Sequence, residues 1–400
     1  MRQASSHGVL HISIAMIYLD NAATSFPKPP VVHEAMLRFA RDTGANPGRS
    51  GHRLSVDAGR VIYDARESIA ELFTVTDPLR VLFTGNATGG LNQALLGLLR
   101  PGDRVVTSGM EHNSVMRPLR ALEAAGVRAV VVPCSPQGVL DPDDLRRALS
   151  ERTAMVVINH GSNVNGCLQS VRELGIVARD AGALFLVDAA QTAGCVEIHM
   201  EDDNIDLLAF TGHKALYGPQ GTGGLVVGER VPLDRMRPLI YGGTGSRSEF
   251  ETQPEFPPDR YESGTPNTIG IAGLGEGVRF VIGTGVQEIR RHEDALAAAL
   301  IEELSSIDGV RLFAAPPERR LSTVSFTCGS LSPSEIGLRL DEEYDILCRV
   351  GLHCSPAAHR SLGSFPEGAV RFSAGYFTSH DDIAAAVDAV RVLSKEGRRA

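Results

Sequence analysis

Seven short apolar runs, separated by segments with helical periodicity, are the feature of this sequence that most restricts its fold. We expect them to form strands at 81–85, 104–109, 128–133, 154–160, 184–190, 206–212 and 223–228. Helical patterns fill most of the gaps, for example at 91–100 and 170–182. Strands that are apolar on both faces and alternate with helices are typical of a mostly parallel sheet with helices on both sides. The sequence therefore predicts an α/β fold.

The pattern changes after about residue 280, which predicts a second, smaller α+β domain. Its expected elements are a long helix within 285–307, strands near 310–314, 323–328 and 370–374, and a final amphipathic helix over about 380–395. We accordingly predict a flexible N-terminal tail at 1–15, a large domain at 16–280 and a small domain at 281–400. The segment 242–267 is rich in Gly, Pro and Ser, which suits either a linker or a functional loop.

The overall composition restricts the class of partner. Of 400 residues, 43% are hydrophobic, and 39 basic residues stand against 48 acidic ones, for a net charge of −9. An acidic chain without a basic block argues against nucleic acid as a partner, and no apolar run is long enough to span a membrane. Six cysteines without a C-x-x-C pair predict reduced thiols in a cytoplasmic protein, with no metal site. A small-molecule substrate is the expected ligand.

Polar residues follow several of the predicted strands at the point where each strand ends. In chain order these residues are Thr88, His112, Asn163, Asp188, Gln191, Thr211, His213 and Lys214. In open α/β sheets, ligands bind at the carboxyl ends of the strands. Each residue alone is compatible with a capped turn or a satisfied core polar group. Their occurrence at the ends of several strands favours a shared site.

An acid and a lysine at the ends of neighbouring buried strands need a common explanation, because burying either charge alone is costly. Pyridoxal phosphate supplies one, since it forms a Schiff base with a lysine and needs a carboxylate opposite its pyridine nitrogen. Lys214 and Asp188 fit these two tasks, with Lys214 made nucleophilic by desolvation. His112 could then stack on the ring and Gln191 could bond the ring hydroxyl. The phosphate would be bound by Thr88, Thr211 and His213.

Seven motifs, in order, resemble those of the class V aminotransferase-like enzymes, and most closely those of the cysteine desulfurases and selenocysteine lyases. They are YLDNAATS, EHNS, SNVNG, VDAAQ, TGHKALYGPQGTGGL, ESGTPNT and RVGLHC, and the resemblance covers residues 16–395. It implies a fold-type I pyridoxal phosphate enzyme with a large domain and a smaller C-terminal α+β domain. It also implies a homodimer with active sites shared at the interface, and the cofactor contacts given above.

The resemblance assigns further roles. Thr265 would reach the phosphate in the neighbouring subunit, and Asn163 and Arg371 would grip the substrate carboxylate. Arg349 matches a family arginine beside the active site, and Cys354 matches the cysteine that attacks the substrate sulfur. One departure lies at the phosphate, where Ala87 replaces a second threonine that the family often has.

The function implied by the resemblance is cysteine desulfuration: L-cysteine becomes L-alanine, and the sulfur passes to Cys354 as a persulfide and then to an acceptor. Lys214 or His112 would manage the Cα proton. The acceptor is left open between a scaffold for iron–sulfur cluster assembly, another sulfur-carrier protein and a simple reductant. The alternatives are selenocysteine as substrate, another class V reaction that does not need Cys354, or a cofactor-binding scaffold without turnover. The set Lys214, Asp188 and His112 argues against the scaffold.

Overall fold

The seven predicted strands form a single sheet in the order β2-β8-β7-β6-β5-β3-β4 in the computed structural model, which describes residues 16–48 and 51–396. Their bounds are β2 Val81–Thr84, β3 Arg104–Ser108, β4 Arg128–Val132, β5 Met155–Asn159, β6 Leu184–Asp188, β7 Leu207–Thr211 and β8 Gly223–Val227. Strands β3 to β7 run parallel, whereas β8 is antiparallel to both of its neighbours, β7 and β2. The prediction of an α/β fold with a mostly parallel sheet is confirmed.

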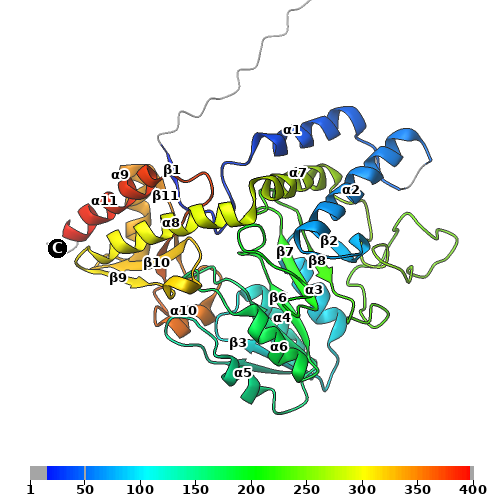
Figure 1. Ribbon diagram of the computed structural model, residues 1–400, viewed down its shortest axis with the longest axis horizontal. Helices are drawn as coiled ribbons and strands as arrows, with labels where there is room; N and C mark the ends of the chain where they lie inside the picture. The colour runs from blue at the N-terminus through cyan, green and yellow to red at the C-terminus, as the bar shows by residue number, and fades with distance from the viewer. Residues whose placement is uncertain (1–15, 49–50, 397–400) are drawn as a thin grey trace, which may run out of the picture.

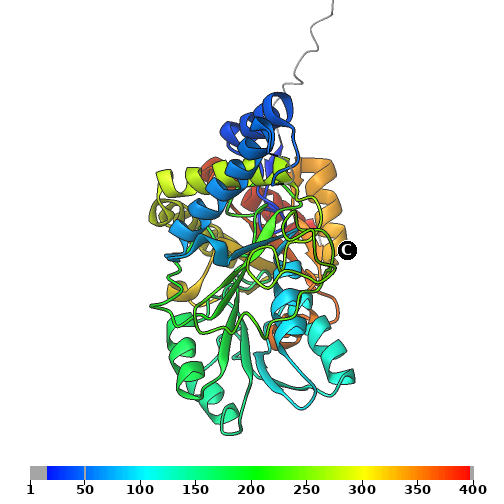
Figure 2. The ribbon, with the colours of Figure 1, turned by 90° about the vertical axis from the view of Figure 1, so that its right-hand side faces the viewer.

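Helices cover both faces of this sheet (Figures 1 and 2). In this part of the chain they are α1 Pro30–Arg38, α2 Arg53–Leu72, α3 Ala87–Leu98, α4 Asn113–Ala124, α5 Pro142–Ala148, α6 Val171–Asp180 and α7 Thr268–Thr284. A π-helical turn, Phe39–Thr43, extends α1, and a 3-10 turn, Pro78–Arg80, precedes β2. Helices α3 and α4 pack on one face of the sheet, and α2, α6 and α7 pack on the other.

The alternation of side chains along each strand explains the two helical layers. On β5, Met155 and Val157 join the core under α3 and α4, whereas Val156 and Ile158 join the core under α6 and α7. All four side chains are fully buried. Because successive residues of a strand point to opposite faces, a strand that is apolar at every position needs a helix on each side.

The C-terminal part forms a second body around a four-stranded antiparallel sheet of order β12-β13-β10-β9 (Figure 1). Its elements are α8 Val286–Ser305, β9 Val310–Phe313, the 3-10 turn Pro317–Arg319, β10 Thr323–Cys328, α9 Pro333–Tyr344, β11 Ile346–Leu347, β12 Arg349–Gly351, α10 Pro356–Leu362, β13 Ala369–Ser373 and α11 His380–Glu396. The predicted strands and both predicted helices are present. The sequence did not predict β11 and β12, because two or three residues are too few to set a period.

The first described segment belongs with this second body in space. Strand β1, Ile17–Tyr18, pairs in parallel with β11, and Leu19 is fully buried in the core formed by α8, α11 and the small sheet. The predicted tail at 1–15 lies outside the described residues. The predicted division of the chain at residue 280 stays a prediction. The pairing of β1 with β11 shows that a strand from the start of the chain packs with the C-terminal part.

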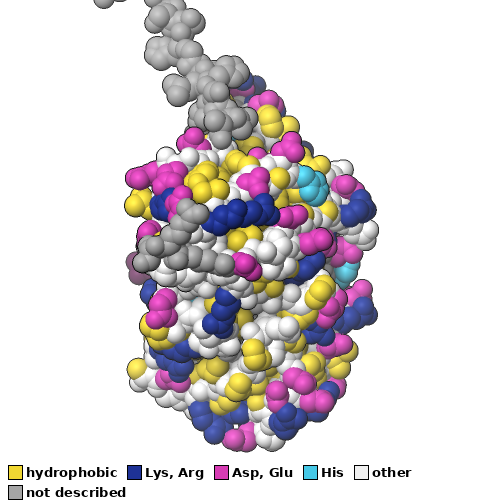
Figure 3. All heavy atoms as spheres, turned by 90° about the vertical axis from the view of Figure 1, so that its left-hand side faces the viewer, with side chains coloured by type: hydrophobic (Ala, Val, Ile, Leu, Met, Phe, Trp, Pro, Cys, Tyr) yellow, Lys and Arg dark blue, Asp and Glu magenta, His cyan; other side chains and the backbone are white. Residues whose placement is uncertain are grey.

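The outer face of the second body carries both signs of charge interspersed, without a large area of one sign (Figure 3). Exposed ion pairs are part of this pattern: Arg339 on α9 bonds both Glu343 and Glu396. Within residues 16–48 and 51–396, no single helix is long and apolar enough to cross a membrane. Helices α7 and α8 reach that length and composition only as a pair, which is bent by 80°.

We predict that Leu19→Ala destabilises the protein, because it opens a cavity in the core shared by the first strand and the C-terminal helices. The free energy of unfolding should fall by about 2–5 kcal/mol, measured by urea denaturation. Leu37→Ala is the matched control: Leu37 is 69% exposed on α1, and its loss should change the free energy by no more than about 0.5 kcal/mol. Equal stabilities of the two variants would contradict the described packing of Leu19.

Candidate active site

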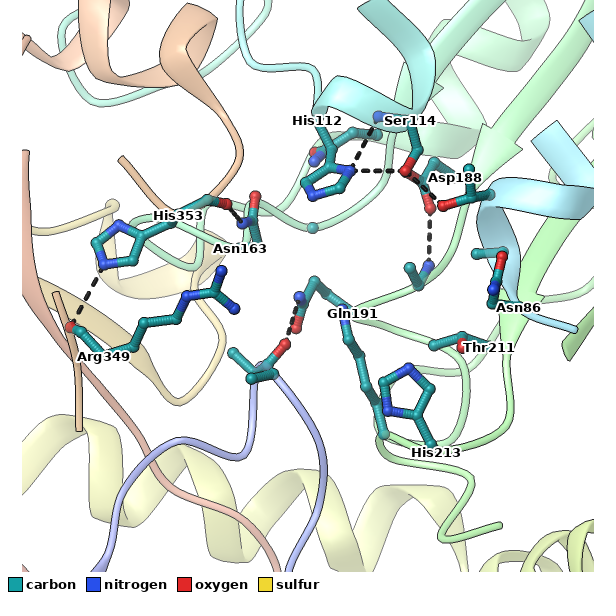
Figure 4. Close-up of a pocket in the computed structure, with 18 of the residues that line it drawn as sticks. Asn86, His112, Ser114, Asn163, Asp188, Gln191, Thr211, His213, Arg349 and His353 are labelled. Carbon is teal, nitrogen blue, oxygen red and sulfur yellow. Dashed lines mark hydrogen bonds between the residues drawn. The ribbon is translucent and has the colours of Figure 1, made fainter. Parts of the chain in front are cut away.

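A cavity of about 260 Å³ lies at the carboxyl ends of the central strands, where the sequence predicted a site. Ten of the twelve predicted residues line it: Thr88, His112, Asn163, Asp188, Gln191, Thr211, His213, Lys214, Arg349 and Arg371. The cavity has two ends. Arg349, His353 and Asn163 lie at one end, and Asn86, Thr211 and His213 lie at the other (Figure 4).

Lys214 follows β7 and lies in the wall of the cavity, where the pKa of its amine is lowered. Burial lowers the pKa of Lys214 to about 8, and the positive charges of Arg371 and Arg349 act in the same direction. The carboxylate of Asp188 opposes the shift without cancelling it. A larger share of the amine is therefore neutral near pH 7 than in an ordinary lysine, and the neutral amine is the nucleophile.

Asp188 ends β6 and is buried at the floor of the cavity. Burial raises its pKa, while a hydrogen bond from the Ala190 backbone N–H to Oδ1, 3.0 Å long, and the nearby Lys214 favour the charged form. A buried carboxyl of this kind becomes most stable as an anion when it meets a cationic N–H group. Asp188 can thus bind a protonated ring nitrogen.

His112 caps the N-terminus of α4 and keeps a defined tautomer. Its Nδ1 accepts the backbone N–H of Ser114 at 3.0 Å, which leaves the proton of the neutral ring on Nε2. Burial, with Lys214 and Arg349 nearby, lowers the pKa of His112 to about 4. At neutral pH the imidazole is therefore uncharged and offers a ring face and one N–H donor.

The opposite end of the cavity offers several donors to an anion. The first turn of α3 begins there: Asn86 caps the helix by accepting the Gly89 N–H at 3.0 Å, and Thr88 lines the cavity. The buried Thr211 Oγ1 and His213 Nδ1 have no hydrogen-bond partner within the described residues. A helix N-terminus with unpartnered donors beside it is suited to a phosphate group.

The Thr88 side chain is oriented by a residue that the sequence analysis did not select. Ser114 Oγ lies 2.7 Å from Thr88 Oγ1 and 2.9 Å from His112 Nδ1, so it joins the Thr88 hydroxyl to the His112 ring (Figure 4). Asn159 and Asn86 also line the cavity without having been selected. The signal for Ser114 was its position in the same short motif as His112.

At the other end, Arg371 is almost wholly buried and mostly engaged. It forms an ion pair with Asp20, which the sequence analysis also missed, and its Nη1 donates to the Asn163 backbone oxygen at 2.9 Å. Its Nε is buried without a partner in the described part of the chain. One donor of the guanidinium therefore stays available to a carboxylate.

The two predicted residues that do not line the cavity are Cys354 and Thr265. Cys354 is exposed, and its sulfur lies 3.5 Å from Nη2 of Arg349, which does line the cavity. The thiol therefore lies at the edge of the site, next to its cationic wall. Thr265 is exposed in the segment between β8 and α7 and lies outside the cavity of its own subunit. Its predicted reach into a neighbouring subunit stays a prediction.

Taken together, these groups fit pyridoxal phosphate. Unpartnered donors and a helix N-terminus fit its phosphate, a buried carboxylate fits its ring nitrogen, and a partly neutral lysine fits its aldehyde. Among the described residues, no group of three or more His, Cys, Asp or Glu side chains could hold a metal ion.

Comparison with known proteins identifies the family. The family model for class-V aminotransferases matches residues 17–385. A probable cysteine desulfurase of Methanothermobacter thermautotrophicus is 35% identical over 375 residues, which are 92% of each chain. A cysteine desulfurase of Haloferax volcanii is 31% identical over 94% of this chain and 88% of its own. Among solved structures, the apo cysteine desulfurase of Thermococcus onnurineus NA1 superposes with a TM-score of 0.89 at 32% identity, over 95% of both chains.

The family match, the two relatives above 30% identity and the geometry of the cavity agree. The chain therefore belongs to the class-V aminotransferase family of enzymes, and the members to which it is similar are cysteine desulfurases.

Proposed function

We propose that this protein is a pyridoxal phosphate-dependent cysteine desulfurase. It converts L-cysteine to L-alanine, takes the sulfur onto Cys354 as a persulfide and passes it to an acceptor. The observation that carries the proposal is the position of one exposed thiol beside Arg349, at the edge of a cavity that holds Lys214 and Asp188.

The cofactor, when bound, supplies an electron sink that stabilises negative charge on the carbon skeleton of the substrate. Lys214 would hold it through its aldehyde, and Asp188 would keep its ring nitrogen protonated. Thr88, Thr211 and His213 would bind its phosphate, Gln191 would face its ring hydroxyl, and His112 would cover its ring.

The proton of the substrate Cα needs a base, and the protein offers Lys214 for this step. Its pKa of about 8 places it near neutrality, where a general base is most effective. His112 is poorly suited to the same role, because its only free nitrogen already carries a proton and its pKa is about 4. His112 instead covers the ring and donates its Nε2–H.

The sulfur step is a displacement at the substrate sulfur. The thiolate is the reactive form of cysteine, and Arg349 offers that thiolate a cationic donor at 3.5 Å. A bond forms between the Cys354 sulfur and the substrate sulfur while the Cβ–S bond breaks. The electron pair of the broken bond stays on the substrate carbon, which takes up a proton and leaves as alanine. An acceptor thiolate then attacks the outer sulfur of the persulfide. A new S–S bond forms on the acceptor, the bond to Cys354 breaks, and Cys354 returns to the thiolate.

The substrate carboxylate is the group that fits the free Nε donor of Arg371. The Asn163 side chain, which the sequence analysis assigned to the same carboxylate, already bonds the His353 carbonyl and the Ser355 hydroxyl, each at 2.7 Å. Arg371 is therefore the principal carboxylate ligand in our proposal, and Asn163 acts with it through its backbone oxygen.

A homodimer is part of the proposal. The segment that carries Thr265 also exposes large apolar side chains, at 65% for Ile240, 67% for Tyr241 and 57% for Phe250. Clustered exposed apolar residues favour a protein interface. A partner subunit that covers this segment would bring Thr265 toward the phosphate of the other active site.

We predict that Lys214→Ala abolishes the visible absorption of the protein-bound cofactor and all turnover of L-cysteine. The sequence has three lysines, at 28, 214 and 395, so the attachment site is easily mapped. Borohydride reduction of the wild-type holoenzyme, followed by peptide mass spectrometry, should place the cofactor on Lys214. Lys395→Ala is the matched control and should keep colour and activity. A coloured, reducible Lys214→Ala protein would refute the assignment.

We predict that Cys354→Ala stops release of alanine and sulfide from L-cysteine, measured by product analysis in the presence of a reductant. The cofactor should still bind, because Cys354 does not line the cavity. Cys348→Ala is the matched control, since this thiol belongs to the same segment, is partly buried and also does not line the cavity. Equal turnover by both variants and the wild type would remove Cys354 from the mechanism.

The same assay tests the alternative substrate. Selenide released from selenocysteine, with no alanine formed from L-cysteine, would assign a selenocysteine lyase. A keto acid formed without any requirement for Cys354 would assign another class V reaction.

A further inference from the structure

The backbone around Cys354, the proposed nucleophile, is held by the Asn163 side chain and by the Asn113 backbone. Asn163 donates from Nδ2 to the His353 carbonyl and accepts the Ser355 hydroxyl at Oδ1, each at 2.7 Å. The backbone N–H of Asn113 donates to the Cys354 carbonyl at 2.9 Å. The carbonyl groups of His353 and Cys354 and the Ser355 hydroxyl therefore have fixed partners. The Cys354 side chain itself is exposed.

The backbone at this point adopts a conformation that needs support. His353 has a φ of 50° and Cys354 has a φ of 59°, so two consecutive residues other than glycine lie in the left-handed region. Such residues are uncommon, and the conformation persists only where surrounding contacts stabilise it. The direction in which the thiol points depends on this conformation.

The contact that supports His353 comes from a second buried histidine. The two rings stack with centroids 5.1 Å apart and planes 28° from parallel, and His353 Nδ1 lies 3.0 Å from His359 Nε2. His359 Nδ1 lies 2.7 Å from Ser364 Oγ. His353 is 3% exposed, and His359 and Ser355 are fully buried. A chain of hydrogen bonds thus runs from Ser364 through both rings to the residue before Cys354.

Only one of the two histidines in this chain of hydrogen bonds lies at the cavity. His353 lines the cavity, whereas His359 lies behind it on α10 and does not. The remaining nitrogen of His353, Nε2, lies 3.4 Å from the carbonyl oxygen of Arg349, the residue whose guanidinium contacts the Cys354 sulfur. His353 therefore connects the histidine pair to Arg349, whose guanidinium contacts the thiol, and directly precedes Cys354 in the sequence.

We propose that His359 is a positioning residue for sulfur transfer: by holding His353 it fixes the left-handed backbone that presents the Cys354 thiol beside Arg349. The proposal rests on the function proposed above for Cys354. It assigns no proton transfer to His359, because the ring touches neither the thiol nor the cavity. Loss of its contact with His353 should leave the lysine chemistry intact and impair only the step that needs the thiol.

Two substitutions separate the two contacts of His359. A glutamine amide reaches the position of imidazole Nε2, so His359→Gln can keep the bond to His353. An asparagine amide reaches the position of Nδ1, so His359→Asn can keep the bond to Ser364 but loses the one to His353. Both variants carry a neutral amide, which makes them a matched pair.

The experiment uses the full-length holoenzyme and compares wild type, His359→Gln, His359→Asn and Cys354→Ala. For His359→Asn we expect the kcat for alanine formation from L-cysteine to fall about ten- to a hundredfold, as for a misplaced reacting group, with little change in KM. In the same variant, the rate at which iodoacetamide alkylates Cys354, measured by mass spectrometry, should differ from the wild-type rate. His359→Gln should stay within about threefold of wild type in both measurements.

β-Chloroalanine supplies the control reaction, because chloride leaves without help from a thiol. Its elimination needs the cofactor and Lys214 but not Cys354, so His359→Asn and Cys354→Ala should both turn it over at the wild-type rate. Cofactor content and melting temperature, measured on each variant, complete the control.

The outcomes separate the two proposals. Full turnover of L-cysteine by Cys354→Ala would refute the proposed function, whatever His359 does. If Cys354→Ala is inactive while His359→Asn keeps wild-type turnover and alkylation, the positioning role is wrong. The positioning role is also wrong if His359→Asn loses β-chloroalanine turnover or cofactor. It is wrong as well if the kcat for alanine formation from L-cysteine falls equally in His359→Gln and His359→Asn.

Discussion

Burial of charge at the carboxyl edge of the seven-stranded sheet is the constraint on which the site depends. The strands are apolar on both faces, so side chains at their ends meet little water. There Lys214 and Asp188 lie near enough to influence each other, yet burial outweighs their attraction and lowers the pKa of the lysine to about 8. An ordinary surface lysine would be almost fully protonated at neutral pH. The packing that stabilises the fold therefore also makes this amine reactive.

The second constraint is the junction between the two bodies, which passes through Arg371. This arginine lies on β13 of the small sheet, but it bonds the Asn163 backbone oxygen after β5 and pairs with Asp20 after β1. A buried guanidinium is costly without partners, and these two contacts fix it in the cavity wall. The small body thereby supplies Arg371, the carboxylate ligand in our proposal, and Arg349, the cationic neighbour of the thiol.

Sequence patterns predicted the large sheet because its strands are apolar on both faces over most of their length, which leaves few alternative folds. They also predicted eight of the ten selected residues that line the cavity, since residues that follow parallel strands lie at one known edge, whereas Arg349 and Arg371 came from the family resemblance. The residues that were missed act through contacts between distant segments. Asp20 meets Arg371 across 351 positions of the chain, and no local period reveals such a pair. Ser114 was missed for another reason: a hydroxyl at the start of a helix is ordinarily a capping residue.

The environment of Cys354 shows what sequence proximity alone cannot settle. His353 and His359 are near the cysteine in the chain, yet their rings bond each other and the thiol contacts Arg349. Because Asn163 and Asn113 hold the peptide units on both sides, the thiol is presented at a fixed place instead of on a swinging loop. In the proposed function, a persulfide on this fixed, exposed sulfur would require the acceptor thiol to approach the edge of the cavity. The exposure of Cys354, more than motion of its loop, would then govern which acceptors can take the sulfur.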